Sequence, residues 1–302
     1  MQIVDSQMHE IGPRLAWENA DNTTRHDVLT EIMLGWMDAV GVDAAIINPG
    51  DAPWLMTAMA QFPERLAGVF HVRNLDQSDV EQRVAQLMTT PGALGHRHTF
   101  GRQPIDPNGS NGREKFKADA FNSLFAACQK YDRPLFCSAY GATDLVGEAA
   151  RTYPRLRLVV DHMGIAQPPL NPHVPEPWRA LDDLLPLAAL PNVYVKLCGA
   201  PVLSDQSFPY TDVWPHIHRI LRAFDVTRVM WASDIGRFQG RIGWSNEFEV
   251  AHGTYRGKHN YAEALRFMLD TDQISESEKE QLLGGTVRRF TGWKPRARPK
   301  EF

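Results

Sequence analysis

The sequence has few cysteines, little net charge and no long apolar run, and each shortage excludes a class of protein. Its three cysteines stand far apart without a Cys-x-x-Cys pair, so no disulfide framework is expected. A net charge of -4 argues against a nucleic-acid surface. No apolar stretch approaches the roughly 20 residues of a membrane span. No basic segment followed by an apolar run opens the chain, so no signal peptide is expected.

These absences predict a cytoplasmic protein that acts on a small molecule, with no nucleic-acid or membrane partner. They leave the oligomeric state open, a homo-oligomer included. The composition, 43% hydrophobic and 23% charged, is ordinary for a globular enzyme. At 302 residues, the chain is long enough for one α/β barrel of about 250 residues.

Short apolar runs alternate with longer amphipathic segments along the whole chain. Strands are expected at residues 3–9, 43–48, 66–73, 92–97, 135–138, 156–162, 193–198 and 228–234. Helical periodicity separates them at residues 28–40, 79–88, 113–130, 143–152 and 213–224. This order predicts an α/β fold of the (β/α)₈ TIM-barrel class, a single domain over residues 1–302 with a peripheral tail at 294–302. The alternative, a doubly wound open sheet, lacks a Gly-x-Gly-x-x-Gly after any early strand.

Three predicted strands end in ionisable side chains, His9, His162 and Asp234. Side chains at the carboxyl ends of barrel strands line the active-site mouth, so these three are the candidate catalytic residues. Strict alternation along the first strand places Asp5 and Gln7 on the same face as His9. Taken singly, each ending has a structural alternative, because a strand-end histidine is more often structural and a Ser-Asp pair is often a helix N-cap.

Four segments resemble the amidohydrolase-related family of metal-dependent hydrolases. They read VDSQMH at residues 4–9, VVDHMG at 159–164, NVYVKLCG at 192–199 and MWASD at 230–234. The similarity extends over nearly the whole chain. It is nearest to the group of 2-pyrone-4,6-dicarboxylate lactonases, sugar lactonases and sulfomuconolactone hydrolases. The resemblance implies an amidohydrolase-like TIM barrel that opens a lactone or another cyclic ester.

The chain departs from the family pattern where metal ligands are expected. The first strand of family members usually reads Asp-x-His-x-His, but Gln7 replaces one histidine here, and strand five ends in Cys137-Ser138 instead of histidine. The ligands that remain from the usual set are His9, His162 and Asp234. The resemblance therefore leaves two expectations open, one divalent metal (zinc or manganese) on these three residues, or metal-free catalysis as in the pyrone-dicarboxylate lactonases.

Polar residues near these strand ends are candidates for substrate binding. Arg97 resembles the family's Gly-x-Arg at the end of strand four and suits a substrate carboxylate, although a structural ion pair is an equal alternative. Lys196 lies inside an apolar strand and has to face a polar mouth or pair with an acid. His71 ends the third strand, and Arg237 follows Asp234 in a loop where a solvated charge is equally expected. Gln7 completes this set.

Together these residues predict that Asp234 takes a proton from water, while His162 and His9 orient that water or polarise the carbonyl. Two other readings stay open. One is a metal-dependent amidase or a non-oxidative aromatic-acid decarboxylase of the same family. The other, from a different class, is a barrel that binds a small molecule without turning it over.

Overall fold

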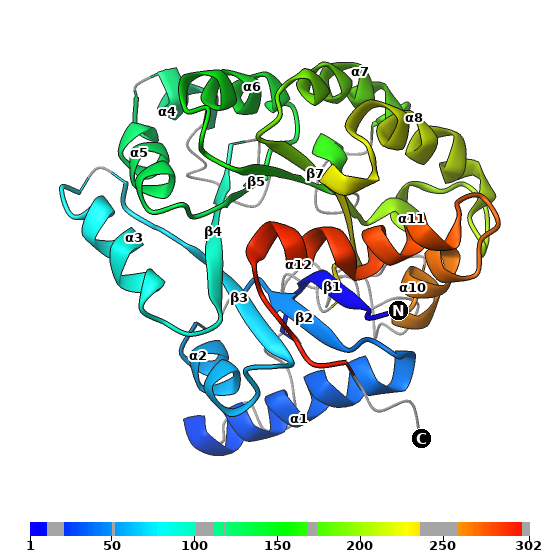
Figure 1. Cartoon of the computed structure of the whole chain (residues 1–302), viewed down its shortest axis with the longest axis horizontal. Helices are drawn as coiled ribbons and strands as arrows, with labels where there is room; N and C mark the ends of the chain where they lie inside the picture. The colour runs from blue at the N-terminus through cyan, green and yellow to red at the C-terminus, as the bar shows by residue number, and fades with distance from the viewer. Residues whose placement is uncertain are drawn as a thin grey trace.

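Eight parallel strands follow one another in sequence order around the centre of the molecule (Figure 1). The computed structural model describes residues 1–10, 21–49, 52–75, 77–100, 112–117, 119–167, 174–235 and 259–297. The strands are β1 (Val4–Met8), β2 (Ala44–Ile47), β3 (Leu66–His71), β4 (Ala93–Thr99), β5 (Leu135–Ser138), β6 (Leu158–Asp161), β7 (Val193–Cys198) and β8 (Val229–Ala232). All eight predicted strands and the TIM-barrel class are therefore confirmed.

Most of the helices lie around the strands in Figure 1, whereas α12 (Thr286–Thr291) crosses the middle of the view. The others are α1 (Asn22–Val40), α2 (Ala52–Gln61), α3 (Val80–Met88), α4 (Gly112–Lys117), α5 (Asn122–Lys130), α6 (Thr143–Thr152), α7 (Leu181–Leu184), α8 (Trp214–Phe224), α10 (Tyr261–Leu269) and α11 (Glu276–Glu280). The single helix predicted at 113–130 is wrong, because α4 ends at Lys117 and α5 begins at Asn122. No helix among the described residues is long and apolar enough to cross a membrane.

Backbone hydrogen bonds just beyond the two strands join β1 to β8 and bring the ends of the sheet together. The amide of Asp234 donates to the Gln7 carbonyl at 3.0 Å, and the amide of His9 donates to the Ile235 carbonyl at 2.8 Å. The Ser6 hydroxyl also donates to the Trp231 carbonyl at 2.6 Å. The seam of the barrel thus holds the end of the first strand beside the end of the last.

Apolar side chains form two separate cores, one inside the barrel and one between the strands and the outer helices. The inner core consists of Val4, Ala44, Ile46, Ala67, Val69, Leu94, Phe136, Val159, Met230, Val287 and Phe290. Val287 and Phe290 come from α12, which therefore closes the amino-terminal end of the barrel. The larger outer core holds most of the remaining buried apolar residues. A polar layer lies above the inner core, at the carboxyl ends of the strands.

Gly284 permits the turn before α12 to pack directly against the start of β1. It lies in a π-helical segment, Gln281–Gly285, and a Cβ atom at this position would collide with the backbone carbonyl of Gln2. The obstacle is main chain, so a rotation of a side chain does not relieve it.

We predict that Gly284→Ala lowers the free energy of unfolding by about 1–3 kcal/mol, because overpacking forces a backbone shift. Gly35→Ala is the matched control, since Gly35 lies in α1 with open space around its Cβ position. It should stabilise the protein by about 0.5–1 kcal/mol. Urea denaturation of both variants checks this, and equal unfolding midpoints for the two would contradict the packing assigned to Gly284.

Candidate active site

The structure brings together the three strand-end residues that the sequence singles out. Nε2 of His9 lies 3.1 Å from Oδ1 of Asp234, and Nε2 of His162 lies 4.0 Å from Oδ2 of the same carboxylate. His9 follows β1, His162 follows β6, and Asp234 lies two residues beyond β8. Asp234 is fully buried, whereas the ring of His9 is partly exposed. A carboxylate between two imidazoles is thus built at the carboxyl ends of the strands.

Two of these residues adopt backbone conformations that L-amino acids rarely occupy. Asp234 has φ of 60° and His162 has φ of 54°, and Met163 and Gly164 continue in the same left-handed region. Each such non-glycine residue carries a conformational cost of about 1–3 kcal/mol, which the surrounding packing has to offset. Strain of this kind clusters at functional sites. Here it occurs in the turns that carry Asp234, the candidate base, and His162.

Gln7 reaches from β1 into the middle of the site. Its side-chain nitrogen Nε2 donates to Oδ1 of Asp234 at 2.6 Å and lies 3.4 Å from Nε2 of His162. Its side-chain oxygen accepts a hydrogen bond from Nζ of Lys196 at 2.9 Å. The opposite orientation of the amide would set its N–H groups against an ammonium and its oxygen against a carboxylate. The neighbours of Gln7 therefore determine which way the amide points.

A buried ion network lies beneath Gln7. Asp161, the last residue of β6, binds Nζ of Lys196 at 2.8 Å and Nε of Arg97 at 2.7 Å. Burial by itself raises the pKa of the Asp161 carboxyl, but Lys196 and Arg97 outweigh that effect and hold its pKa well below the usual range. Nζ of Lys196 also lies 4.5 Å from the centre of the Phe136 ring, at the top of the inner core. Both cations are almost completely buried.

The structure places the predicted substrate-binding residues at different depths. Lys196 is fully buried, between Asp161 and Gln7. Arg97 donates through Nε to Asp161 at 2.7 Å. His71 is exposed at the end of β3 and pairs in register with Arg97 on β4. Partial desolvation of the imidazole and the nearby Arg97 charge lower the pKa of His71. Arg237 lies outside the described residues.

Asp5 does not share the face of Gln7 and His9, so the strict alternation predicted for this strand is wrong. The pairing of β1 with β2 is irregular between Asp5 and Met8, which shifts the alternation. Asp5 instead accepts hydrogen bonds from the amide and hydroxyl of Ser233 and from the Tyr261 hydroxyl at 3.0 Å. Burial raises its pKa to about 6 despite these donors. Asp5 therefore supports the turn that carries Asp234 and does not line the site.

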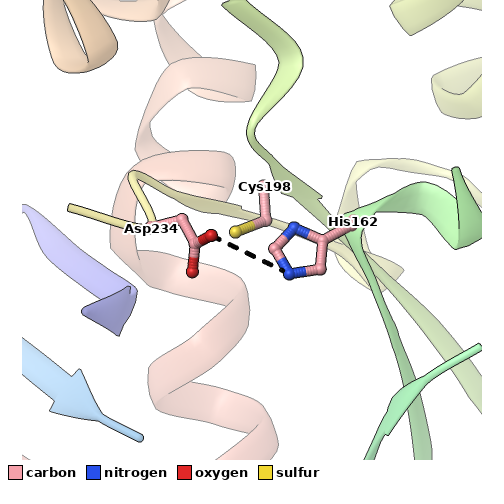
Figure 2. A group of neighbouring side chains, drawn as sticks. All are labelled: His162, Cys198 and Asp234. Atoms are coloured by element: carbon pink, nitrogen blue, oxygen red, sulfur yellow. Dashed lines mark ion pairs between the residues drawn. The ribbon is translucent and has the colours of Figure 1, made fainter. Parts of the chain in front are cut away.

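His162, Cys198 and Asp234 form a group whose ligand atoms lie within 4.8 Å of one another, close enough for one metal ion. Figure 2 shows the three side chains turned toward a common point from the ends of β6, β7 and β8. Imidazole, thiolate and carboxylate are all zinc ligands. Burial and the nearby Asp234 charge raise the pKa of the Cys198 thiol well above its usual range.

Two residues of this site were not identified from the sequence. Asp161 was visible as an acid that ends an apolar strand, and the buried cations Arg97 and Lys196 required an anion, but the strands that supply them lie far apart in the sequence. Cys198 has no comparable signal in the sequence, and its sulfur faces His162 and Asp234.

The profile of the family described as Amidohydrolase matches residues 4–293, which is nearly the whole chain. A curated relative, L-fucono-1,5-lactonase of Burkholderia ambifaria, is 37% identical over 99 residues, but this match covers 31% of the chain and 32% of that protein. The chain is also 24% identical over 245 residues to the 4-sulfomuconolactone hydrolase of Rhizobium radiobacter, covering 76% of the chain and 74% of the relative.

A solved structure of an amidohydrolase from Burkholderia multivorans with bound zinc has a similar fold. Its TM-score is 0.66 at 21% identity, and the match covers 97% of this chain and 100% of the other. At this level of identity the likeness shows the fold alone.

We predict that Asp161→Asn lowers the free energy of unfolding by about 3–5 kcal/mol, because it leaves Arg97 and Lys196 buried without their anion. Asp144→Asn is the matched control. It removes a carboxylate from the exposed pair with Arg113 and should cost at most about 1 kcal/mol. Urea denaturation distinguishes the two, and a loss for Asp161→Asn as small as that of the control would contradict a buried network.

Proposed function

The chain is a hydrolase of the amidohydrolase family, and we propose that it opens a lactone or related cyclic ester that carries a carboxylate. The observation that carries the proposal is the buried Asp234 carboxylate, whose Oδ1 accepts a hydrogen bond from Gln7 and lies 3.1 Å from Nε2 of His9. The names of two relatives, a fuconolactonase and a sulfomuconolactone hydrolase, support the ester class.

Asp234 is suited to act as the general base. Gln7 and His9 both place a nitrogen against its Oδ1, and His162 lies beyond its Oδ2. Donors to one oxygen stabilise the carboxylate as an anion and fix its direction, while the second oxygen remains oriented toward His162. The strained backbone at Asp234 supports the same assignment, since the surrounding structure holds this side chain where an unstrained turn would not.

In the proposed reaction Asp234 takes a proton from water, and the resulting hydroxide adds to the lactone carbonyl carbon. The tetrahedral intermediate then collapses with cleavage of the acyl carbon–oxygen bond. The ring oxygen leaves as an alcohol after receiving the proton from Asp234, and the acyl group is released as a carboxylic acid that loses its proton to solvent. His9, whose ring is partly exposed, orients the water or polarises the carbonyl, while Nε2 of His162 faces the Gln7 amide at 3.4 Å. General acid–base catalysis of this kind contributes roughly 10²–10⁴-fold.

Arg97 is suited to hold a carboxylate of the substrate. Its Nε is engaged by Asp161, which fixes the plane of the guanidinium, and no acceptor for its two terminal amino groups lies among the residues that the structure describes. Such a planar pair of donors matches a carboxylate in a two-point contact. His71, beside Arg97 in register and exposed, lies where the same substrate would pass.

The residues do not fit a metal in the orientation that Gln7 adopts. His162, Cys198 and Asp234 are suitable ligands by type and distance. However, the amide N–H groups of Gln7 are directed at two of them, His162 and Asp234, where a cation would require an electron pair instead. We therefore assign no step to a metal. An amidase or decarboxylase would depend on a firm metal site, so the orientation of Gln7 favours the lactonase.

We predict that Asp234→Asn lowers kcat for lactone opening by about 10²–10⁴-fold, because the amide keeps the hydrogen bond from Gln7 but cannot accept a proton from water. Asp182→Asn, which removes an exposed pair with Arg219, is the control and should retain full activity. Initial rates on a panel of carboxylated lactones, with circular dichroism to verify folding, test this. A folded Asp234→Asn variant of normal rate would eliminate the proposed base.

We predict that Arg97→Lys lowers kcat/KM for a carboxylated lactone by roughly 10- to 100-fold, the usual worth of a charged hydrogen-bonded contact. Lysine keeps a positive charge beside Asp161 but loses the two terminal donors. An uncharged lactone with the same ring should lose little. Equal losses on both substrates would show that Arg97 serves only its pair with Asp161.

A further inference from the structure

We infer that Lys196 and Gln7 together replace a divalent cation in this site and keep one from binding. The ammonium of Lys196 orients the Gln7 amide, and the amide presents N–H donors to the two groups that a metal would otherwise bridge. Gln7 is then a positioning residue for Asp234 and His162. The inference concerns what the site holds, and it does not depend on which ester the enzyme opens.

Lys196 fixes the orientation of the Gln7 amide. Lys196 carries only donors, so the atom of Gln7 that faces it has to be the oxygen, 2.9 Å away. The nitrogen is thereby turned toward Asp234, 2.6 Å away. The Lys196 ammonium is itself fixed, because Asp161 binds it at 2.8 Å and the Phe136 ring packs against it. The Gln7 amide therefore keeps this orientation.

The two N–H groups of the Gln7 amide are directed at Asp234 and His162. One hydrogen of Nε2 is donated to Oδ1 of Asp234, and the other faces Nε2 of His162 at 3.4 Å. Nε2 of His162 then acts as the acceptor, so the neutral ring carries its proton on Nδ1. A zinc ion needs lone pairs from its ligands at about 2.0–2.2 Å. Both lone pairs are already directed at the amide.

The buried charges around Gln7 already balance without a metal ion. Arg97 and Lys196 carry two positive charges, and Asp161 and Asp234 carry two negative charges, so these four buried side chains are neutral as a group. A divalent ion would add two positive charges to a region of low dielectric constant, and loss of the Cys198 thiol proton would compensate only one of them. The Lys196 ammonium therefore supplies the positive charge that a metal would bring. The Gln7 amide, which Lys196 orients, donates a hydrogen bond to Asp234.

Gln7→Glu tests the inference with the smallest change. The carboxylate can still accept from Lys196, but its other oxygen replaces the N–H donor that faces Asp234 and His162. The variant thus offers an additional acceptor and an additional negative charge where the wild type offers a donor. We expect its zinc affinity to be roughly 10- to 100-fold higher than that of the wild type.

The experiment uses the full chain of wild type and Gln7→Glu, dialysed in parallel against the same buffered zinc concentrations, with zinc per chain measured by mass spectrometry. Cobalt titration provides a second readout, since a Cys198 thiolate bound to cobalt adds a charge-transfer band. The expected result is a wild type without stoichiometric zinc and a variant with about one per chain. About one zinc in the wild type, or a folded variant that binds no more tightly, overturns the inference.

Lys196→Met provides the same test if Gln7→Glu does not fold. It frees the amide to turn its oxygen toward the site, so zinc affinity should again rise. Lys279→Met is the matched control, because Lys279 is also largely buried and pairs with Glu276 on α11. It should leave zinc binding unchanged. A wild type that is free of zinc but opens no lactone would count against the proposed function and leave this inference standing.

Discussion

The buried ammonium of Lys196 is the interaction on which the arrangement of the site depends. A lysine at this depth is tolerated only because Asp161 and Gln7 accept from it and the Phe136 ring lies beside it. The two acceptors, Asp161 and Gln7, also hold other residues of the site. Asp161 also fixes Arg97, and Gln7 also fixes Asp234. A single charge inside the barrel therefore positions both the proposed base and the proposed carboxylate-binding group.

The barrel seam supplies the second constraint. Backbone hydrogen bonds from Asp234 to Gln7 and from His9 to Ile235 bring residues from the two ends of the chain into one site. Asp5 reinforces the seam by binding Ser233, the residue before Asp234. The left-handed conformation of Asp234 is held by these contacts, so the stability of the seam and the geometry of the base are linked. The same contacts therefore stabilise both the barrel and the position of Asp234.

Most of the fold could be predicted from the sequence because strands and helices differ in the period of their apolar residues. Every predicted strand ends within about two residues of the observed one, and the strand-end positions of His9, His162 and Asp234 follow from the barrel. Two features could not be predicted. The irregularity between Asp5 and Met8 breaks the alternation without any signal such as glycine. The partner of Lys196 on β7 is Asp161, which lies on the neighbouring strand β6 and is separated from it in sequence by several helical segments.

The measurement that tests the account most directly is the rate of carboxylated-lactone opening before and after dialysis of the wild-type protein against a strong zinc chelator. If Asp234, the histidines and the buried cations perform the chemistry, the rate stays the same, and added zinc or manganese does not increase it. A rate that disappears with the chelator and returns with one divalent ion per chain would contradict the account. The Gln7 amide would then have to turn away from the site when metal is bound.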